Sequence, residues 1–168
     1  MKNFVQLFAI FLIFTSCESQ EKLVYVPINT AKYNYLALGD SYTIGESVCI
    51  DCRFPEQLKT ALQNKYTSDD FGLQIIAQTG WTTSNLIGSI NRLAPKNNFD
   101  LVTLLIGVNN QYQNRPFSLY ETEFPDLVNR SIALAKGDKT NVIVVSIPDY
   151  AYTTFGAGSL AISNKLLE

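Results

Sequence analysis

The 168-residue chain contains no histidine, and this absence excludes more chemistry than any other feature of its composition. Without an imidazole there is no His-ligated metal site, and no Ser-His dyad or triad is complete within these residues. The chain also lacks a large net charge of either sign. It has 13 Lys and Arg and 15 Asp and Glu, which gives a net charge of -2. No basic field is available to collect phosphates, so we expect no nucleic-acid partner.

The remaining composition is that of an ordinary globular protein. Hydrophobic residues make up 46% of the chain and charged residues 17%, and the length is close to that of one typical domain. No glycine-rich phosphate loop of the Walker type occurs, so nucleotide hydrolysis has no support. We therefore expect one folded domain with one core.

The amino terminus has the features of an export signal. Lys2 supplies a positive charge, and residues 4–14 form an apolar stretch of signal-peptide length that is short for a membrane span. The segment ends at Thr15-Ser16-Cys17, which resembles the lipobox of bacterial lipoproteins, where the cysteine is lipidated and becomes the first mature residue. The alternatives are a plain secretory signal and an apolar helix.

The lipobox interpretation divides the chain into three parts. Residues 1–16 are predicted to be a lipoprotein signal peptide, residues 17–32 a tether, and residues 33–168 the folded domain. The protein would then be exported, and only the lipid on Cys17 would attach it to a membrane.

The two remaining cysteines, Cys49 and Cys52, are spaced as Cys-x-x-Cys. In an exported chain an even pair favours a local disulfide, or an inert pair that stiffens a loop. Two free thiols, half of a metal site and a thioredoxin-like redox centre are the alternatives. A metal site lacks further Cys or His ligands downstream. A redox centre needs the pair at a helix start directly after a strand, whereas a polar loop precedes it here.

Continuous apolar runs bounded by turn residues predict strands that are buried on both faces, as in a parallel sheet. The runs are Tyr35 to Leu38, Leu73 to Ala77, Leu101 to Ile106 and Val142 to Ile147.

Amphipathic segments between these runs predict helices, which begin near Phe54, Thr82 to Ser84, and Phe124. Pro125 is expected to restart or kink the third helix. A fourth helix is expected to start near Ser159. The alternating order predicts a three-layer α/β domain with right-handed crossovers.

Small and polar residues follow three of the predicted strands. The first strand is followed by Gly39-Asp40-Ser41, the second by a loop around Gly80, and the third by a loop that contains Asn109. Ligands bind beyond the carboxyl ends of strands in open parallel sheets. A serine hydroxyl, a glycine N–H and an Asn amide are the groups needed to attack an acyl carbonyl and bind the oxyanion. Each loop taken singly is more often structural.

With these three blocks, residues 35 to about 155 resemble the SGNH, or GDSL-like, hydrolase family. The resemblance implies that Ser41 is the nucleophile, and that the backbone N–H groups of Ser41 and Gly80 form an oxyanion hole with the Asn109 side chain. Asp40 is then a structural residue beneath the nucleophile. The family also implies a flavodoxin-like sheet of strand order 2-1-3-4-5. We expect no cofactor and no metal.

Two departures from the family pattern stand out. Asn110 occupies a place where family members often have Asp. The Asp-x-x-His block, which supplies the base and its orienting partner, has no counterpart, and the chain stops within a helical pattern. We therefore expect a shortened chain whose parent continues into a further helix, a strand and Asp-x-x-His, and weak or no activity in the histidine-free form.

The leading functional prediction is a serine ester hydrolase that acts on an acylated sugar, a lysolipid or a similar ester. Trp81 and Tyr42 are candidates for lining an acyl or sugar pocket, with ordinary packing as the alternative for each. A non-catalytic exported lipoprotein that binds a ligand at the same strand-end cleft is the second hypothesis. A thiol oxidoreductase based on Cys49 and Cys52 ranks third.

Overall fold

The computed structural model of the chain describes residues 31–149. The predicted signal peptide, the lipobox Cys17 and the helical start at Ser159 lie outside the described residues. Within residues 31–149, no helix is long and apolar enough to cross a membrane.

A parallel sheet of four strands forms the centre of the fold, in the order β2-β1-β3-β4. The strands are β1 (Tyr33–Gly39), β2 (Phe71–Ala77), β3 (Leu101–Leu105) and β4 (Val142–Val144). Each begins at or within two residues of an apolar run predicted from the sequence, and the order agrees with the flavodoxin-like prediction over these four strands. The β3 and β4 strands end earlier than predicted.

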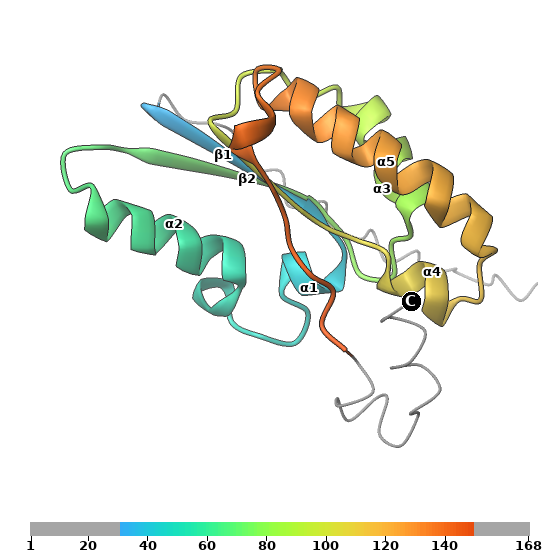
Figure 1. The fold of residues 1–168 in the computed structure, drawn as a ribbon. Coiled ribbons are helices and arrows are strands. Elements are labelled where there is room, and N and C mark those ends of the chain that lie inside the picture. The colour runs from blue at the N-terminus through green and yellow to red at the C-terminus, as the bar shows by residue number, and fades with distance from the viewer. Residues whose placement is uncertain (1–30, 150–168) are drawn as a thin grey trace, which may run out of the picture.

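Helices cover both faces of the sheet, so the predicted three-layer arrangement is confirmed (Figure 1). The helices α1 and α2 lie on one face, and α3 and α5 lie on the other. Their bounds, with the short α4, are α1 (Ser41–Ile44), α2 (Phe54–Lys65), α3 (Thr83–Leu93), α4 (Val108–Tyr112) and α5 (Phe117–Leu134).

Alternate residues of β1 pack into two separate core clusters. Leu36 and Leu38 belong to the larger cluster, which includes residues of α3 and α5. Tyr35 and Ala37 belong to the smaller cluster, against which Leu58 of α2 packs. The period-two alternation of a strand explains this division, and it fixes the strand register between the helix layers.

The third helix differs from its prediction. It begins at Phe117, well before Phe124, and continues through Pro125 instead of restarting there. Pro125 lies on the exposed side of α5, where water can hydrogen-bond the carbonyl that proline leaves free. The opposite side of the helix buries Leu127 and Ser131, so packing against the sheet holds the helix in one piece.

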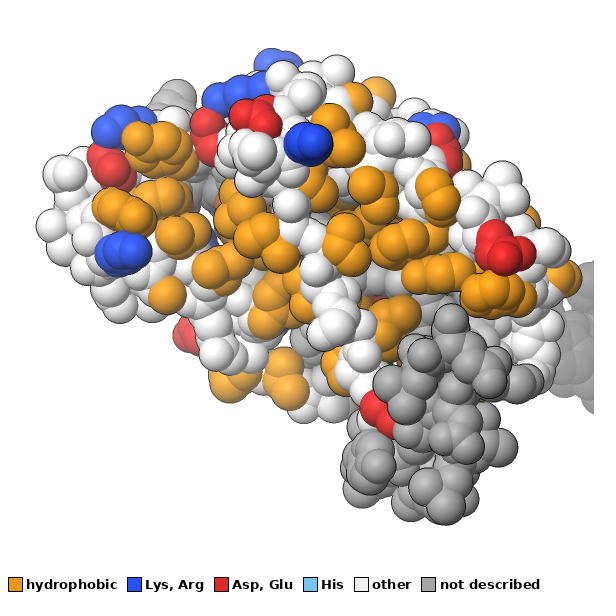
Figure 2. Space-filling model, viewed as in Figure 1, with side chains coloured by type: hydrophobic (Ala, Val, Ile, Leu, Met, Phe, Trp, Pro, Cys, Tyr) orange, Lys and Arg blue, Asp and Glu red, His pale blue; other side chains and the backbone are white. Residues whose placement is uncertain are grey.

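The least buried strand is β4, at one edge of the described sheet. Ile143 and Val144 are 49% and 50% exposed. Figure 2 shows hydrophobic side chains gathering on the face where β4 runs between α2 and α5. The other three strands are mostly buried, so the core is centred on β1 and its two neighbours.

Candidate active site

Ser41 lies where β1 ends and α1 begins. The preceding Asp40 caps this short helix, because its Oδ1 accepts a hydrogen bond of 3.0 Å from the backbone N–H of Tyr42. The Asp40 carbonyl accepts further bonds from the backbone N–H groups of Thr43 and Ile44 at 3.1 Å and 2.9 Å. Ser41 is half-buried, and the cap holds it at the carboxyl edge of the sheet.

The Asp40 side chain is fully buried, and this burial raises the pKa of its carboxyl group to about 6. Backbone hydrogen bonds from Tyr42 and from Asp40 itself oppose the rise. The second oxygen, Oδ2, has no hydrogen-bond partner in the part of the chain that the structure describes. Asp40 therefore lies beneath the Ser41 loop as a helix cap, where its carboxylate form is costly.

The three strand ends that lead into the predicted site are adjacent in register. Gly39 at the end of β1 pairs with Ala77 of β2 and Leu105 of β3, and neighbouring strands lie about 4.8 Å apart. The predicted site residues follow these strand ends within four positions: Ser41, Gly80 and Asn109. The sheet topology therefore brings their loops to one edge.

Asn109 contacts the loop of Gly80 directly. Its side-chain Nδ2 donates to the Trp81 carbonyl at 2.9 Å, and Gln113 Nε2 donates to the Gly80 carbonyl at 2.7 Å. The backbone of Gly80 has φ of 80°, a left-handed conformation that favours glycine. Because Nδ2 carries two hydrogens, Asn109 retains one donor beyond its bond to Trp81.

Asn110 has a structural role that the sequence analysis missed. It is buried, its Oδ1 accepts from the backbone N–H of Thr83 at 3.0 Å, and its Nδ2 donates to Thr83 Oγ1 at 2.7 Å. The Thr83 hydroxyl in turn donates to Glu123 of α5. An Asp at 110 could not replace this bond, because the single hydroxyl hydrogen of Thr83 is already given to Glu123. Asn at this place thus fits its neighbours.

Glu123 also accepts hydrogen bonds from Ser84 Oγ at 2.7 Å and 2.9 Å. It therefore holds the first turn of α3 from a helix some forty residues further along the chain. No sequence signal identified this contact, because Glu123 sits in a helical pattern like any other polar residue. The α3 start is also fixed by Asn85 Oδ1, which accepts from the backbone N–H of Thr82 at 3.0 Å.

The loop after α1, which follows Ser41, is hydrogen-bonded to the Gly80 loop. Thr79, next to Gly80, donates its hydroxyl hydrogen to the Glu46 carboxylate. Glu46 follows Gly45, the left-handed residue that ends α1. The two loops proposed to supply the oxyanion hole are thus tied together by a side-chain hydrogen bond.

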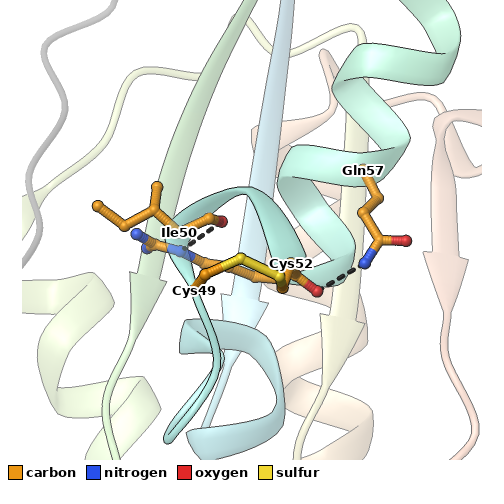
Figure 3. The surroundings of a disulfide bond; sticks show 5 residues. Cys49, Ile50, Cys52 and Gln57 are labelled. Carbon is orange, nitrogen blue, oxygen red and sulfur yellow. Dashed lines mark hydrogen bonds between the residues drawn. A yellow bond between two sulfur atoms is a disulfide. The ribbon is translucent and has the colours of Figure 1, made fainter.

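Cys49 and Cys52 form a disulfide in the loop between α1 and α2, with a Cα–Cα distance of 5.0 Å (Figure 3). Gln57 Nε2 donates to the Cys52 carbonyl at 2.6 Å, and Arg53 Nε donates to the Ile50 carbonyl at 3.2 Å. The pair lies on an exposed loop and not at a helix start directly after a strand. The thioredoxin-like arrangement therefore has no counterpart here.

The disulfide loop leads into a residue that packs against the end of α1. Arg53 is buried, and a Cβ added to Gly45 would lie 2.9 Å from both Cβ and Cγ of Arg53. The disulfide loop and the end of α1 are therefore in close contact. Among residues 31–149, no group of three His, Cys, Asp or Glu residues is placed to hold a metal ion.

The sheet topology brings the half-buried Ser41, the Gly80 loop and the Asn109 side chain to one edge of the sheet. Of the two aromatic candidates, Trp81 is buried in the larger core cluster and also lines a surface groove. Its side chain therefore both packs in the core and borders the groove. Tyr42 is half-buried and does not line that groove.

Comparison with known proteins identifies the family of the chain. The model of the GDSL-like lipase/acylhydrolase family matches residues 37–167. Among curated protein sequences, none matches the chain significantly.

Several solved structures share the fold. A structure of TesA superposes with a TM-score of 0.57 at 13% identity, covering 79% of this chain and 72% of that one. AlinE4, an SGNH-hydrolase family esterase, gives 0.57 at 16% identity, covering 83% and 75%. The lipase Lip_vut3 from a goat rumen metagenome gives 0.58 at 16% identity, covering 80% and 70%. The fold is that of SGNH hydrolases, and the chain belongs to the GDSL-like lipase/acylhydrolase family.

Proposed function

We propose that the protein is a serine ester hydrolase in which Ser41 is the nucleophile. Ser41 Oγ attacks the carbonyl carbon of an ester, and the alcohol leaves with a proton once the acyl–Ser41 bond has formed. Water then cleaves that bond and regenerates the hydroxyl. The N–H groups of Ser41 and Gly80 and the Asn109 amide hold the oxyanion in both steps.

One observation carries this proposal: the Asn109 amide donates to the Trp81 carbonyl next to Gly80, from a loop whose strand is paired with that of Ser41. This hydrogen bond therefore ties the Asn109 side chain to the residue that follows Gly80. The acyl group would be carried by a sugar, a lysolipid or a similar alcohol.

Removal of the Ser41 proton is expected to be the slow step. The 168 residues hold no imidazole, and a serine hydroxyl is a poor nucleophile without a positioned base. Glu46 is engaged by Thr79, and Asp40 by the cap of α1, so neither carboxylate is assigned this role. We expect weak turnover, or none, from this form.

Covalent labelling tests the nucleophile without requiring turnover. A fluorophosphonate should add to Ser41, slowly, and intact-mass analysis should show no addition to Ser41→Ala. Ser118→Ala, which changes an exposed serine at the start of α5, is the matched control and should be labelled like the wild type. Labelling, or hydrolysis of a short-chain aryl ester, that is unchanged in Ser41→Ala would exclude Ser41 as nucleophile.

The absence of histidine favours one second candidate, a non-catalytic protein that binds an ester or related ligand at the same strand-end cleft. Such a protein would bind an ester without acylation of Ser41. Stoichiometric binding with no fluorophosphonate addition over a full day would support this candidate against the hydrolase.

We also propose export and lipid anchoring through Cys17. The support is the sequence alone: a positive residue, an apolar stretch and Thr15-Ser16-Cys17. Expression in a bacterium with labelled palmitate should give a labelled membrane-bound protein, and Cys17→Ser should abolish the label. An unlabelled wild-type protein would contradict the proposal.

A further inference from the structure

A groove of about 340 Å³ runs along the surface of α3 and begins beside the Gly80 loop. Gln78, one residue past β2, and Trp81, next to Gly80, line one end. The rest of the lining comes from α3 between Ser84 and Arg92. From Asn85 to Arg92 the helix rises about 10 Å, so the groove extends roughly two helical turns from the proposed active site.

The groove lining combines one aromatic ring with several hydrogen-bonding side chains. Trp81 is 8% exposed and is the single tryptophan of the chain. The Asn85 Oδ1 is used at the start of α3, but its Nδ2 donates to no group within residues 31–149. The buried Ser89 hydroxyl accepts from Arg92 Nη2 at 3.3 Å. Polar donors and acceptors therefore lie along the groove, and the exposed part of an apolar ring lies at one end.

Arg92 adds a positive charge to the far end of the groove. No carboxylate pairs with it in the described part of the chain. Its guanidinium has five N–H donors, of which the bond to Ser89 uses one. The remaining donors are available to a ligand in the groove.

Gly88, in the middle of α3, is explained neither by the backbone nor by packing. Its φ is not in the left-handed region, and an added Cβ would meet no atom within 4 Å. A glycine within a helix is less stable than alanine, so the sequence gives up helix stability here without a local reason. Because Gly88 lines the groove, any side chain at this position would stand in it.

We propose that this groove binds a pyranose ring of a glycan, so that the ester cleaved at Ser41 is carried by a carbohydrate. The assignment rests on the ester hydrolase function proposed above. A sugar ring presents C–H groups that can contact the exposed part of an aromatic ring and hydroxyl groups that both donate and accept, which matches Trp81, Asn85 and Arg92. An acyl chain would leave these polar groups buried without partners, and a phosphate would find a single cation.

The groove also joins the proposed active site through Trp81. The Trp81 carbonyl accepts the hydrogen bond from Asn109 Nδ2, the proposed oxyanion donor. A sugar that contacts the exposed part of Trp81 would therefore lie beside the loop that we propose binds the oxyanion. The same Gly80 loop is tied through Thr79 to Glu46, in the loop that follows Ser41 and α1.

Intrinsic fluorescence of the full chain tests the proposal, since Trp81 is its sole tryptophan. The probes are xylotriose, N,N′-diacetylchitobiose and digalacturonate. At least one should change the fluorescence in a saturable manner. Gly88→Leu should weaken that binding by tenfold or more through filling the groove, and Arg92→Gln by about tenfold through loss of charged hydrogen bonds.

Ala61→Leu is the matched control, because it adds the same side chain to an exposed position of α2, on the other face of the sheet. It should bind like the wild type, and circular dichroism should show that all three variants are folded. No response to any of the three saccharides, or binding that survives both Gly88→Leu and Arg92→Gln, would overturn the proposal. So would saturable binding of dodecanoate or phosphorylcholine in place of the saccharides.

This measurement needs no turnover, so it separates the groove from the hydrolase function. Saccharide binding with no fluorophosphonate addition at Ser41 would support the groove and overturn the nucleophile. Labelling of Ser41 without saccharide binding would support the nucleophile and overturn the groove.

Discussion

The end of β1 and the middle of α3 differ sharply in the space around a glycine. A Cβ added to Gly39 would lie 2.0 Å from Thr43 Oγ1 and 2.4 Å from the Leu105 carbonyl oxygen, whereas one added to Gly88 would touch nothing within 4 Å. Close packing at Gly39 fixes the loop that carries Ser41. Open space at Gly88 leaves room for the saccharide that we propose as the ligand of the groove. The fold thus combines a closely packed turn before Ser41 with an open surface on α3.

The largest effect is expected for Gly39→Ala. The new methyl group would overlap Thr43 Oγ1 and the backbone of β3, which cannot move without breaking the sheet register. We expect the free energy of unfolding to fall by about 3 kcal/mol or more, measured by urea denaturation. A loss below about 1 kcal/mol would show that the β1 end is not closely packed and would remove half of the comparison.

The next effect concerns the buried Asp40 carboxyl beneath Ser41. Burial raises its pKa from 3.8 to about 6, so the folded protein holds the proton more tightly than the unfolded chain. The stabilisation from protonation is full below about pH 4 and is lost as the pH rises through about 6. A shift of this size corresponds to about 3 kcal/mol between these limits.

Asp40→Asn tests this dependence, because Asn keeps an acceptor for the Tyr42 N–H but does not ionise. Urea denaturation of both proteins from pH 4 to 7 gives the difference in unfolding free energy. The unfolding free energy of Asp40→Asn relative to that of the wild type should increase as the pH rises. A constant difference across the series would show that the carboxyl beneath Ser41 is not desolvated.

A smaller effect is expected at the Cys49–Cys52 disulfide. It closes a loop of only four residues, for which the loss of chain entropy in the unfolded state amounts to about 2 kcal/mol. Replacing both cysteines by serine should lower the free energy of unfolding by about this amount in urea. Wild-type protein treated with a reductant should match the variant.

The variant with both cysteines replaced by serine should affect the Ser41 loop but not the groove on α3. Because the disulfide loop contacts α1 through Arg53 and Gly45, fluorophosphonate labelling of Ser41 should slow. Trp81 fluorescence should respond to saccharides as before, since the loop lies on the opposite face of the sheet from α3. Unchanged labelling and unchanged stability would together show that the disulfide does not support the Ser41 loop.

Local patterns in the sequence predicted the strands and the positions of Ser41, Gly80 and Asn109. Each strand is a short apolar run, and each loop follows directly from it, so no long-range information was needed. Contacts between distant residues were not predictable in this way. Glu123 binds Thr83 forty residues away, and this bond exists only because α3 and α5 pack side by side on the sheet.

The early start of α5 has a similar cause. A proline is unfavourable inside a helix, but the burial of the opposite side of α5 outweighs this cost at Pro125. The groove on α3 also escaped prediction, since Gly88 carries no sequence signal apart from lowering helix propensity. Its significance depends on the empty space around its Cα, which only the fold reveals.

The smallest effect, with the opposite sign, is expected for Gly88→Ala. Alanine loses less backbone entropy in a helix and meets no neighbour at this position, so the free energy of unfolding should rise by about 0.5–1 kcal/mol in urea denaturation. Gly137→Ala is the matched control, because its added Cβ also meets no atom within 4 Å but its φ is 78°. It should destabilise the protein by about 1 kcal/mol through backbone strain alone. If Gly88→Ala were also destabilising, the glycine would serve the fold of α3, and it would no longer be evidence for a groove kept open at the expense of helix stability.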